Sequence, residues 1–126
     1  MYRDTDYAII DLETTGFSPK NHDRIVEVGI VRADPHGNRL QEYCTLINPR
    51  RDVGGTQVHG ITATDVAGAP AFRDVVGDIH EMLRGAVIVA HNTQFDLRFL
   101  CHECEESGAP LPEVLSLCTL SLAKIV

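Results

Sequence analysis

The sequence lacks the long apolar runs and the basic surplus that mark two large classes of protein. It contains no uninterrupted apolar segment of membrane-spanning length and no positively charged start followed by an apolar stretch, so neither membrane insertion nor secretion is expected. Its 11 Lys and Arg stand against 18 Asp and Glu, for a net charge of −7. A broad basic face for nucleic acid requires the opposite balance, because that attraction scales with the phosphates neutralised. We expect a cytoplasmic chain with no membrane partner, whose contacts with nucleic acid are local.

The sequence also lacks repeats, low-complexity segments and signs of a disulfide framework. The cysteines are four in number, at Cys44, Cys101, Cys104 and Cys118. Nothing else indicates an oxidising compartment or a small stapled fold, so reduced thiols are expected. A length of 126 residues suits a single domain with a real core and no internal boundary.

An acid pair interrupts an apolar run near the start of the chain. Residues 7–17 read YAIIDLETTGF, and their first four residues are typical of a buried strand. Successive strand side chains point to opposite faces, so Asp11 and Glu13 would share one face. Two carboxylates at the rim of an apolar sheet repel each other and lose hydration, so one takes up a proton or a cation lies between them. The pair is therefore a candidate metal site.

Two β-rich runs and a loop follow. Residues 24–34 and 39–49 are joined by PHGN at 35–38, which predicts an antiparallel hairpin. Residues 49–60 contain two adjacent glycines and little periodicity, which is typical of a surface loop.

The second half of the chain alternates helix and strand patterns. A short helix is expected after residue 62, where Thr62 and Asp65 have the spacing of a capping box. The patterns then predict a helix at 70–84, a strand at 86–90, a helix capped by Asn92, a strand at 114–119 and a final helix from 119. This order predicts an α/β domain with an antiparallel flank and at least one parallel crossover.

Three acids are expected to converge on one edge of this sheet. If the strand at 7–10 and the strand at 86–90 lie parallel, their carboxyl ends open on the same edge, where open α/β sheets place ligands. Asp11 and Glu13 follow the first strand, and Asp96 follows the second by six residues. Several convergent carboxylates suit two Mg²⁺ or Mn²⁺ ions about 4 Å apart around a transferring phosphoryl group. This chemistry fits phosphodiester hydrolysis.

Three ordered motifs carry a family resemblance. DLETTGF (11–17), VHGIT (58–62) and AHNTQFDLRFL (90–100) resemble the first motif, the intermediate loop and the second motif of the DEDDh 3′ to 5′ exonucleases, a family typified by the epsilon proofreading subunit of bacterial DNA polymerase III. The resemblance covers nearly the whole chain, and ordered motifs at suitable separations are far more specific than any one alone.

The resemblance implies roles for individual residues. Asp11 would bridge two ions, Glu13 would bind the ion on the nucleophile side, and Asp96 would bind the ion on the leaving-group side. The residues implied to contact the terminal nucleotide are Thr14, Thr15, Gly16, Val58, His59, His91 and Phe95.

The resemblance also implies a fold and a substrate. The fold would be a ribonuclease H-like mixed sheet with an antiparallel three-strand flank and helices on its faces. The activity would be the release of nucleoside 5′-monophosphates from single-stranded DNA 3′ ends, with two Mg²⁺ or Mn²⁺ ions, in proofreading or repair. A DNA polymerase would be a partner.

One part of the family pattern is not reached. The family completes its site with a third motif, a His-x4-Asp pair on a later helix that supplies the general base and a fourth carboxylate. The chain stops at Val126 before such a motif, so we expect an exonuclease domain, 1–126, that is C-terminally incomplete, impaired in activity, and able to self-associate through its apolar last residues.

Simpler interpretations exist for each residue. The acid pair could be a solvated strand face, Asp96 an acid favoured in a first helical turn, and the two histidines ordinary loop residues. Cys101 and Cys104 have the spacing of a zinc box, but the helical stripe around them favours packing. Two alternative functions also stand: a non-catalytic nucleic-acid-binding or polymerase-associated module of the same fold, and an RNA 3′ exonuclease, since no residue reads a 2′-hydroxyl.

Overall fold

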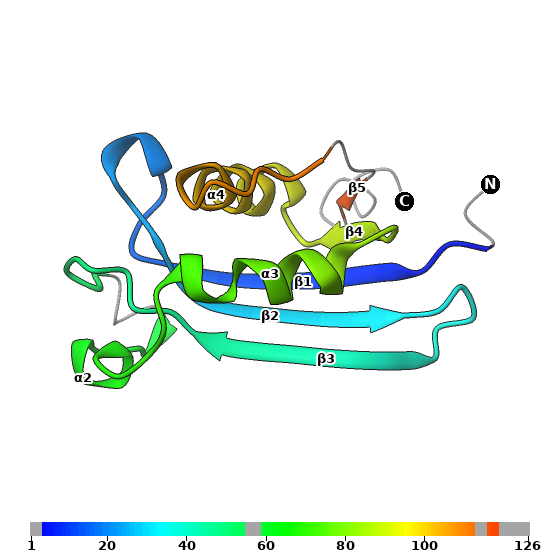
Figure 1. Cartoon of the computed structure of the whole chain (residues 1–126), viewed down its shortest axis with the longest axis horizontal. Helices are drawn as coiled ribbons and strands as arrows, with labels where there is room; N and C mark the ends of the chain where they lie inside the picture. Colours follow the sequence, from blue (N-terminus) through cyan, green and yellow to red (C-terminus); the bar gives the residue numbers. More distant parts are fainter. Residues whose placement is uncertain (1–3, 55–58, 113–115, 119–126) are drawn as a thin grey trace.

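Five strands form one mixed sheet in the order β3-β2-β1-β4-β5 (Figure 1). The computed structural model describes residues 4–54, 59–112 and 116–118. β2 pairs antiparallel with β1 and β3, whereas β4 is parallel to β1 and to β5. The strands are β1 (Tyr7–Thr14), β2 (Ile25–Ala33), β3 (Arg39–Leu46), β4 (Val87–Ala90) and β5 (Ser116–Cys118). The predicted α/β sheet with an antiparallel three-strand flank is confirmed.

Strand β1 runs through the middle of the sheet and separates its two faces by alternation. Ala8, Ile10 and Leu12 are buried in the main core, so Asp11 and Glu13 project from the opposite face, as the period of two requires. The strand continues to Thr14, four residues past the apolar run that predicted it.

The predicted hairpin is present between β2 and β3. Its turn is closed by the Asp34 side chain, whose Oδ1 accepts hydrogen bonds from the backbone N–H groups of His36 and Asn38 at 2.9 and 2.8 Å. The pKa of Asp34 is held below its usual value first by a hydrogen bond from the Asn38 side chain to Oδ2 at 3.0 Å, and then by these backbone bonds. Gly37 takes the left-handed conformation (φ +86°) that the turn needs.

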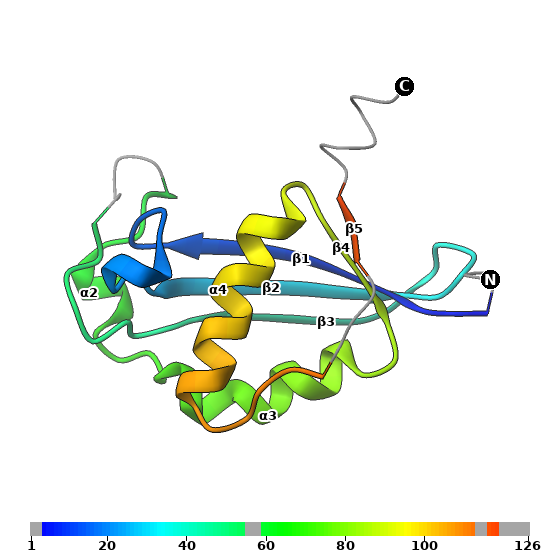
Figure 2. The ribbon, with the colours of Figure 1, turned by 90° about the horizontal axis from the view of Figure 1, so that it is seen from above.

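Helices lie on both faces of the sheet. α3 (Phe72–Leu83) and α4 (Thr93–Glu106) pack on the face formed by Ala8, Ile10 and Leu12, while α2 (Ala63–Val66) joins a smaller cluster of Val26, Val53, Ile61 and Val66. Figure 2 shows α4 crossing over β1 and β2 towards α3. The expected helices on the faces are thus confirmed.

Local signals place the helix ends well, with two differences. The capping box of Thr62 and Asp65 is present at α2. α3 begins at Phe72 instead of residue 70, and Asp74 closes its first turn by accepting from the backbone N–H of Ala71. Asn92 occupies the N-cap position of α4, but its side chain makes no capping hydrogen bond, so that prediction was wrong. The helix expected from residue 119, with its apolar tail, lies outside the described residues.

One buried carboxylate ties α4 to the sheet. Glu103 is 1% exposed and accepts from Arg24 Nε at 2.9 and 3.0 Å, from Arg24 Nη2 at 2.5 Å and from the backbone N–H of Ile25 at 3.1 Å. The hydrogen bond to Glu103 raises the pKa of Arg24. A buried carboxylate with this many donors is fully compensated, and it joins the helix to the first residue of β2.

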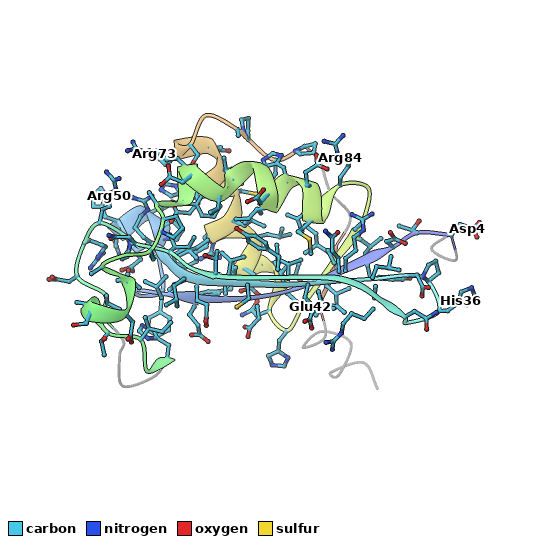
Figure 3. All side chains as sticks on the ribbon, turned by 60° about the horizontal axis from the view of Figure 1, so that its bottom comes forward. Asp4, His36, Glu42, Arg50, Arg73 and Arg84 are labelled. Carbon is cyan, nitrogen blue, oxygen red and sulfur yellow. The ribbon has the colours of Figure 1, made fainter. Side chains whose placement is uncertain are left out.

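Most other charged side chains lie at the periphery. Figure 3 shows Arg73 and Arg84 pointing outward from α3, Glu42 on the far side of the sheet and His36 at the tip of the hairpin. A short η1 turn (Pro19–Asn21) links β1 to β2. Within the described residues, no helix combines the length and the apolar character needed to cross a membrane.

We predict that Glu103→Ala lowers the free energy of unfolding by about 3 kcal/mol. The loss should lie at the lower end for a broken buried pair because the Arg24 side chain is 34% exposed and can be rehydrated. Urea unfolding at pH 7 measures it, with Glu105→Ala, an exposed position on the same helix, as the control expected to stay within about 0.5 kcal/mol. A Glu103→Ala protein as stable as the control would contradict this role.

Candidate active site

Asp11 and Glu13 lie side by side on the open face of β1. Asp11 is exposed and Glu13 is half-buried. Opposite Asp11 on β2 stands Gly29, which has no side chain to cover the acid. The predicted shared face is therefore present, and the cross-strand position opposite Asp11 carries no side chain.

The pair is under electrostatic tension. The pKa of Glu13 is raised, first by burial, then by the Asp11 carboxylate and by Glu27, while His59 acts in the opposite direction. Burial and like charge both disfavour the ionised form, and a nearby cation favours it. A cation bound beside Glu13 would thus favour its ionised form and offset the repulsion from Asp11 and Glu27.

Glu27 is a third acid beside this pair, and the sequence analysis did not assign it to the site. It is the cross-strand partner of Glu13, next to a β-bulge where Thr14 pairs with Ile25 and Val26 is the extra residue. Bulges often lie beside functional sites, where they redirect side chains. The hairpin register, which the sequence alone did not supply, brings this third carboxylate to Glu13.

His59 supplies an unsatisfied donor next to the acids. Its Nδ1 accepts the backbone N–H of Ile61 at 2.9 Å, so the neutral ring carries its proton on Nε2. That Nε2 is buried and has no hydrogen-bond partner among the described residues. A buried donor without a partner indicates a place for a ligand oxygen. Val58, the other predicted residue of this loop, lies outside the described residues.

The segment Thr14–Gly16 forms a rigid turn after β1. Thr14 Oγ1 donates to the carbonyl of Gly16 at 2.6 Å, and the backbone N–H of Thr15 donates to the carbonyl of Arg24 at 2.8 Å. Thr15 is buried, and its hydroxyl donates to Asp23 at 3.0 Å. Thr15 therefore fixes the conformation of the turn through its hydrogen bonds to Arg24 and Asp23.

Phe17 was missed by the sequence analysis. Directly after this turn, its side chain is 82% exposed, which is unusual for so large an apolar group. Exposed aromatic rings are groups on which nucleic-acid bases can stack. The signal available in the sequence was an aromatic residue within a polar turn.

Asp96 lies in the first turn of α4 and is 9% exposed. The recorded pairs between β1 and β4 end at Ile9 with Val89, and continuing that register would bring Asp11 level with His91, just before α4. The start of α4 therefore follows β4 beside the part of β1 that carries Asp11. His91 is exposed, and the ring of Phe95 packs against that of Phe99 at a tilt of 53°, with centroids 5.1 Å apart.

The donor chemistry fits a hard divalent ion. Asp11 and Glu13 offer oxygen ligands, which Mg²⁺ and Mn²⁺ prefer, and burial together with the neighbouring Asp11 raises the pKa of Glu13. Over residues 4–54, 59–112 and 116–118, however, no three His, Cys, Asp or Glu side chains are arranged to hold a metal together. Asp96 as the third ligand stays a prediction.

The zinc alternative at Cys101 and Cys104 finds no support. Cys104 is buried in the main core, and burial raises its pKa to about 12, while burial also raises the pKa of Cys101. Zinc binds thiolates, which these environments disfavour. Cys104 serves packing of α4 in the main core.

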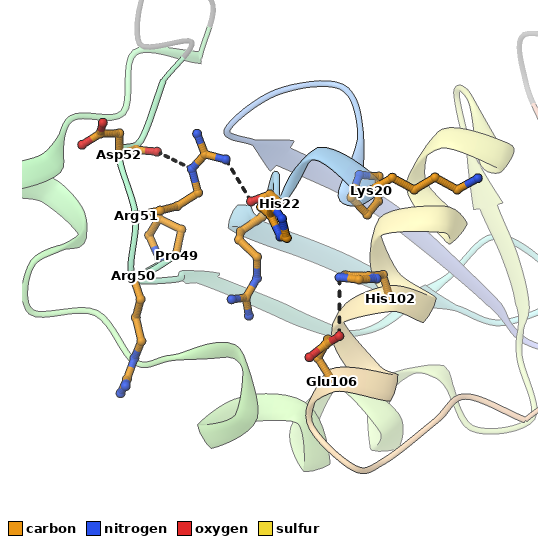
Figure 4. Close-up of a pocket in the computed structure, with 10 residues that line it drawn as sticks. Lys20, His22, Pro49, Arg50, Arg51, Asp52, His102 and Glu106 are labelled. Carbon is orange, nitrogen blue, oxygen red and sulfur yellow. Dashed lines mark hydrogen bonds and ion pairs between the residues drawn. The ribbon is translucent and has the colours of Figure 1, made fainter.

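A separate cleft of about 650 Å³ contains cationic residues but none of the three acids. Its lining includes Lys20, Arg24, Arg50 and Arg51, and Figure 4 shows Arg51 bonded to the carbonyl groups of His22 and Asp52. Arg24 is already paired with Glu103. Because these two arginines have partners within the chain, the cleft does not compete with the acid pair as a catalytic centre.

Comparisons with known proteins agree with this geometry. The family model RNase_T, described as "Exonuclease", matches residues 8–126. The chain is 34% identical over 122 residues to the 3'-5' exonuclease DinG of Bacillus subtilis and 44% identical over 98 residues to a DNA polymerase III subunit epsilon-like protein of Rhodobacter capsulatus. The alignments cover 95% and 75% of this chain but only 13% and 14% of those relatives.

A solved structure shares the fold. E. coli Exonuclease I, in complex with a dT13 oligonucleotide, superimposes with a TM-score of 0.85 and 15% sequence identity, covering 97% of this chain and 29% of that one. At this identity the likeness establishes the ribonuclease H-like fold alone.

We predict that Asp11→Asn lowers the pKa of Glu13 towards its ordinary value. The substitution removes the second-largest cause of the upward shift and leaves burial in place. Because the raised pKa favours the protonated folded chain, the stability that Glu13 contributes is present at low pH and lost as the pH rises through that pKa. Carboxyl ¹³C NMR titration of metal-free protein measures the shift; Glu42→Gln, on β3, should leave it unchanged. An unaltered Glu13 titration in Asp11→Asn would contradict the pairing.

Proposed function

The chain belongs to the RNase_T exonuclease family, and we propose that it carries the acid pair and the substrate turn of a metal-dependent 3′ to 5′ exonuclease. Its substrate would be the 3′ end of single-stranded DNA, and its product a nucleoside 5′-monophosphate. The protein would work in proofreading or repair beside a DNA polymerase, as the relatives named for DNA polymerase III suggest.

The observation that carries this proposal is the Asp11–Glu13 pair at the carboxyl end of β1. Two adjacent carboxylates, one with a raised pKa, are costly unless a cation accompanies them. They lie towards the carboxyl end of β1, and α/β folds place ligands at the carboxyl ends of their strands. A solvated strand face would not require Glu13 to be partly buried beside two further acids.

Each residue of the site has a proposed role. Asp11, Glu13 and Asp96 would hold Mg²⁺ or Mn²⁺, two ions in the complete site. The ions would supply charge neutralisation for the reacting phosphate and acidify a water molecule. The free Nε2–H of His59 is suited to donate to a phosphate oxygen.

The substrate turn would hold the terminal nucleotide. Thr14, Thr15 and Gly16 present a fixed backbone surface, and the exposed ring of Phe17 offers a stacking platform. His91 and Phe95, at the start of α4, would border the same nucleotide. The proton acceptor for the attacking water is unassigned among the described residues; a base typically contributes about 10² to 10⁴ in rate, so we expect weak activity from residues 1–126 alone.

We predict that a labelled single-stranded DNA oligonucleotide is shortened from its 3′ end in the presence of Mn²⁺, and that Asp11→Asn lowers the rate by about 100-fold or more, because a charged ligand of the divalent ion is lost. Glu42→Gln serves as the control, since this exposed acid lies on β3. A matched RNA oligonucleotide tests substrate choice. Equal rates for the protein and for Asp11→Asn would refute the assignment, and absence of both cleavage and Mn²⁺ uptake would favour the non-catalytic module.

We also predict that Phe17→Ala weakens substrate binding more than turnover. Loss of one stacked base costs about 1–3 kcal/mol, so KM for the oligonucleotide should rise with kcat little changed. Steady-state kinetics measure this, and Phe17→Trp, which keeps a stacking ring, should stay close to the unaltered protein. An unchanged KM in Phe17→Ala would remove the ring from the binding surface.

A further inference from the structure

The turn after β1 is built around one carboxylate. Asp23, whose side chain is 16% exposed, accepts hydrogen bonds from Thr15 Oγ1 at 3.0 Å, from the backbone N–H of Ser18 at 3.1 Å and from Arg51 Nη1 at 3.1 Å. The first donor belongs to the proposed substrate turn, the second is the residue that follows the turn, and the third comes from the segment 51–54 that precedes His59. A single side chain thus joins two segments that are far apart in the sequence.

At two glycines, neighbouring atoms approach so closely that a side chain would not fit. A Cβ at Gly16 would lie 2.4 Å from Asp23 Oδ2, and a Cβ at Gly54 would lie 2.6 Å from the carbonyl oxygen of Thr15. Neither distance is compatible with a side chain unless its surroundings shift. Gly16, although part of the DLETTGF motif, is therefore required by Asp23 within the fold, independently of any substrate.

The residue after Asp23, Arg24, connects this region to the helix that carries Asp96. Arg24 pairs with Glu103 on α4, the helix that carries Asp96 seven residues earlier, two turns along the axis. Residues 23 and 24 consequently hold the substrate turn, the segment before His59 and the helix of Asp96 at one point.

From these contacts we infer that Asp23 is a positioning residue for the terminal nucleotide. It contacts no reacting atom and acts through Thr15, Ser18 and Arg51, setting the relative placement of the Thr14–Phe17 turn and the His59 segment. The inference rests on the proposed function for its ligand, a nucleoside 5′-monophosphate unit at the end of a DNA strand. The part of the inference that concerns structure, namely that Asp23 orders the turn, does not depend on the proposed function.

The first measurement is hydrogen exchange in the metal-free chain. Asp23→Asn keeps the size of the side chain but removes its charge and places an amide donor where it must face another donor. The backbone amide of Ser18 should exchange at least tenfold faster, while amides in the centre of β2 stay unchanged. Asp52→Asn is the matched control, because only the backbone oxygen of Asp52 engages Arg51. Unaltered Ser18 exchange in Asp23→Asn would overturn the inference.

The second measurement is the affinity for thymidine 5′-monophosphate with Mn²⁺, followed by NMR titration. Asp23→Asn should weaken binding about tenfold, and Asp52→Asn should leave it unchanged. Weakened order with unchanged affinity would reduce Asp23 to a purely structural residue and overturn its positioning role. If the unaltered protein does not bind the monophosphate, the proposed function fails, and the positioning role for a nucleotide fails with it, while the exchange result still decides whether Asp23 orders the turn.

A double-mutant cycle tests the close fit directly. Gly16→Ala should destabilise the protein, and most of that loss should disappear in an Asp23→Ala background, where the carboxylate that meets the new methyl group is gone. Urea midpoints of the four proteins measure the coupling. An equal loss in both backgrounds would show that Asp23 is not what requires glycine at position 16.

Discussion

The bond network of Glu103 is the constraint on which the arrangement of the site depends. Arg24 and the first amide of β2 converge on this buried carboxylate, and the backbone of Arg24 pairs in turn with Thr15 at the end of β1. Helix α4, strand β2 and the substrate turn are therefore fixed relative to one another at one place. Because buried charges tolerate little displacement from their partners, this point resists sliding of the helix over the sheet.

The acids at the end of β1 show the opposite design. Asp11, Glu13 and Glu27 gather on one face, and His59 lies near enough to Glu13 to oppose the rise in its pKa. Their mutual repulsion weakens the folded chain and creates a local field that attracts cations. The charge of Glu103 is balanced by Arg24, whereas Glu13 lies beside two like charges. A fixed support next to a proposed cation site has this combination.

Sequence patterns predicted the framework because local signals and global packing agree in it. The alternation in β1, the PHGN turn, the Thr62 capping box and the apolar stripe of α4 each carry their structure in a few neighbouring residues. The missed features depend on register or on three-dimensional neighbours: Glu27 reaches Glu13 only through the hairpin pairing, and Asp23 acquires its role only when residues 15, 18 and 51 meet. The side chain of Asn92 makes no cap because an N-cap position alone does not fix its orientation.

The proposed site consists of a divalent ion held by Asp11 and Glu13, with Asp96 as the third ligand. Paramagnetic broadening of amide resonances during a Mn²⁺ titration locates such an ion directly. Broadening should begin at residues 11–13 and 96 and leave the hairpin tip at 35–38 sharp. If it began instead at the cleft lined by Lys20, Arg50 and Arg51, whose lining also includes the acids Asp52 and Glu106, or if residues 11–13 broadened without residue 96, the three-acid site would be contradicted.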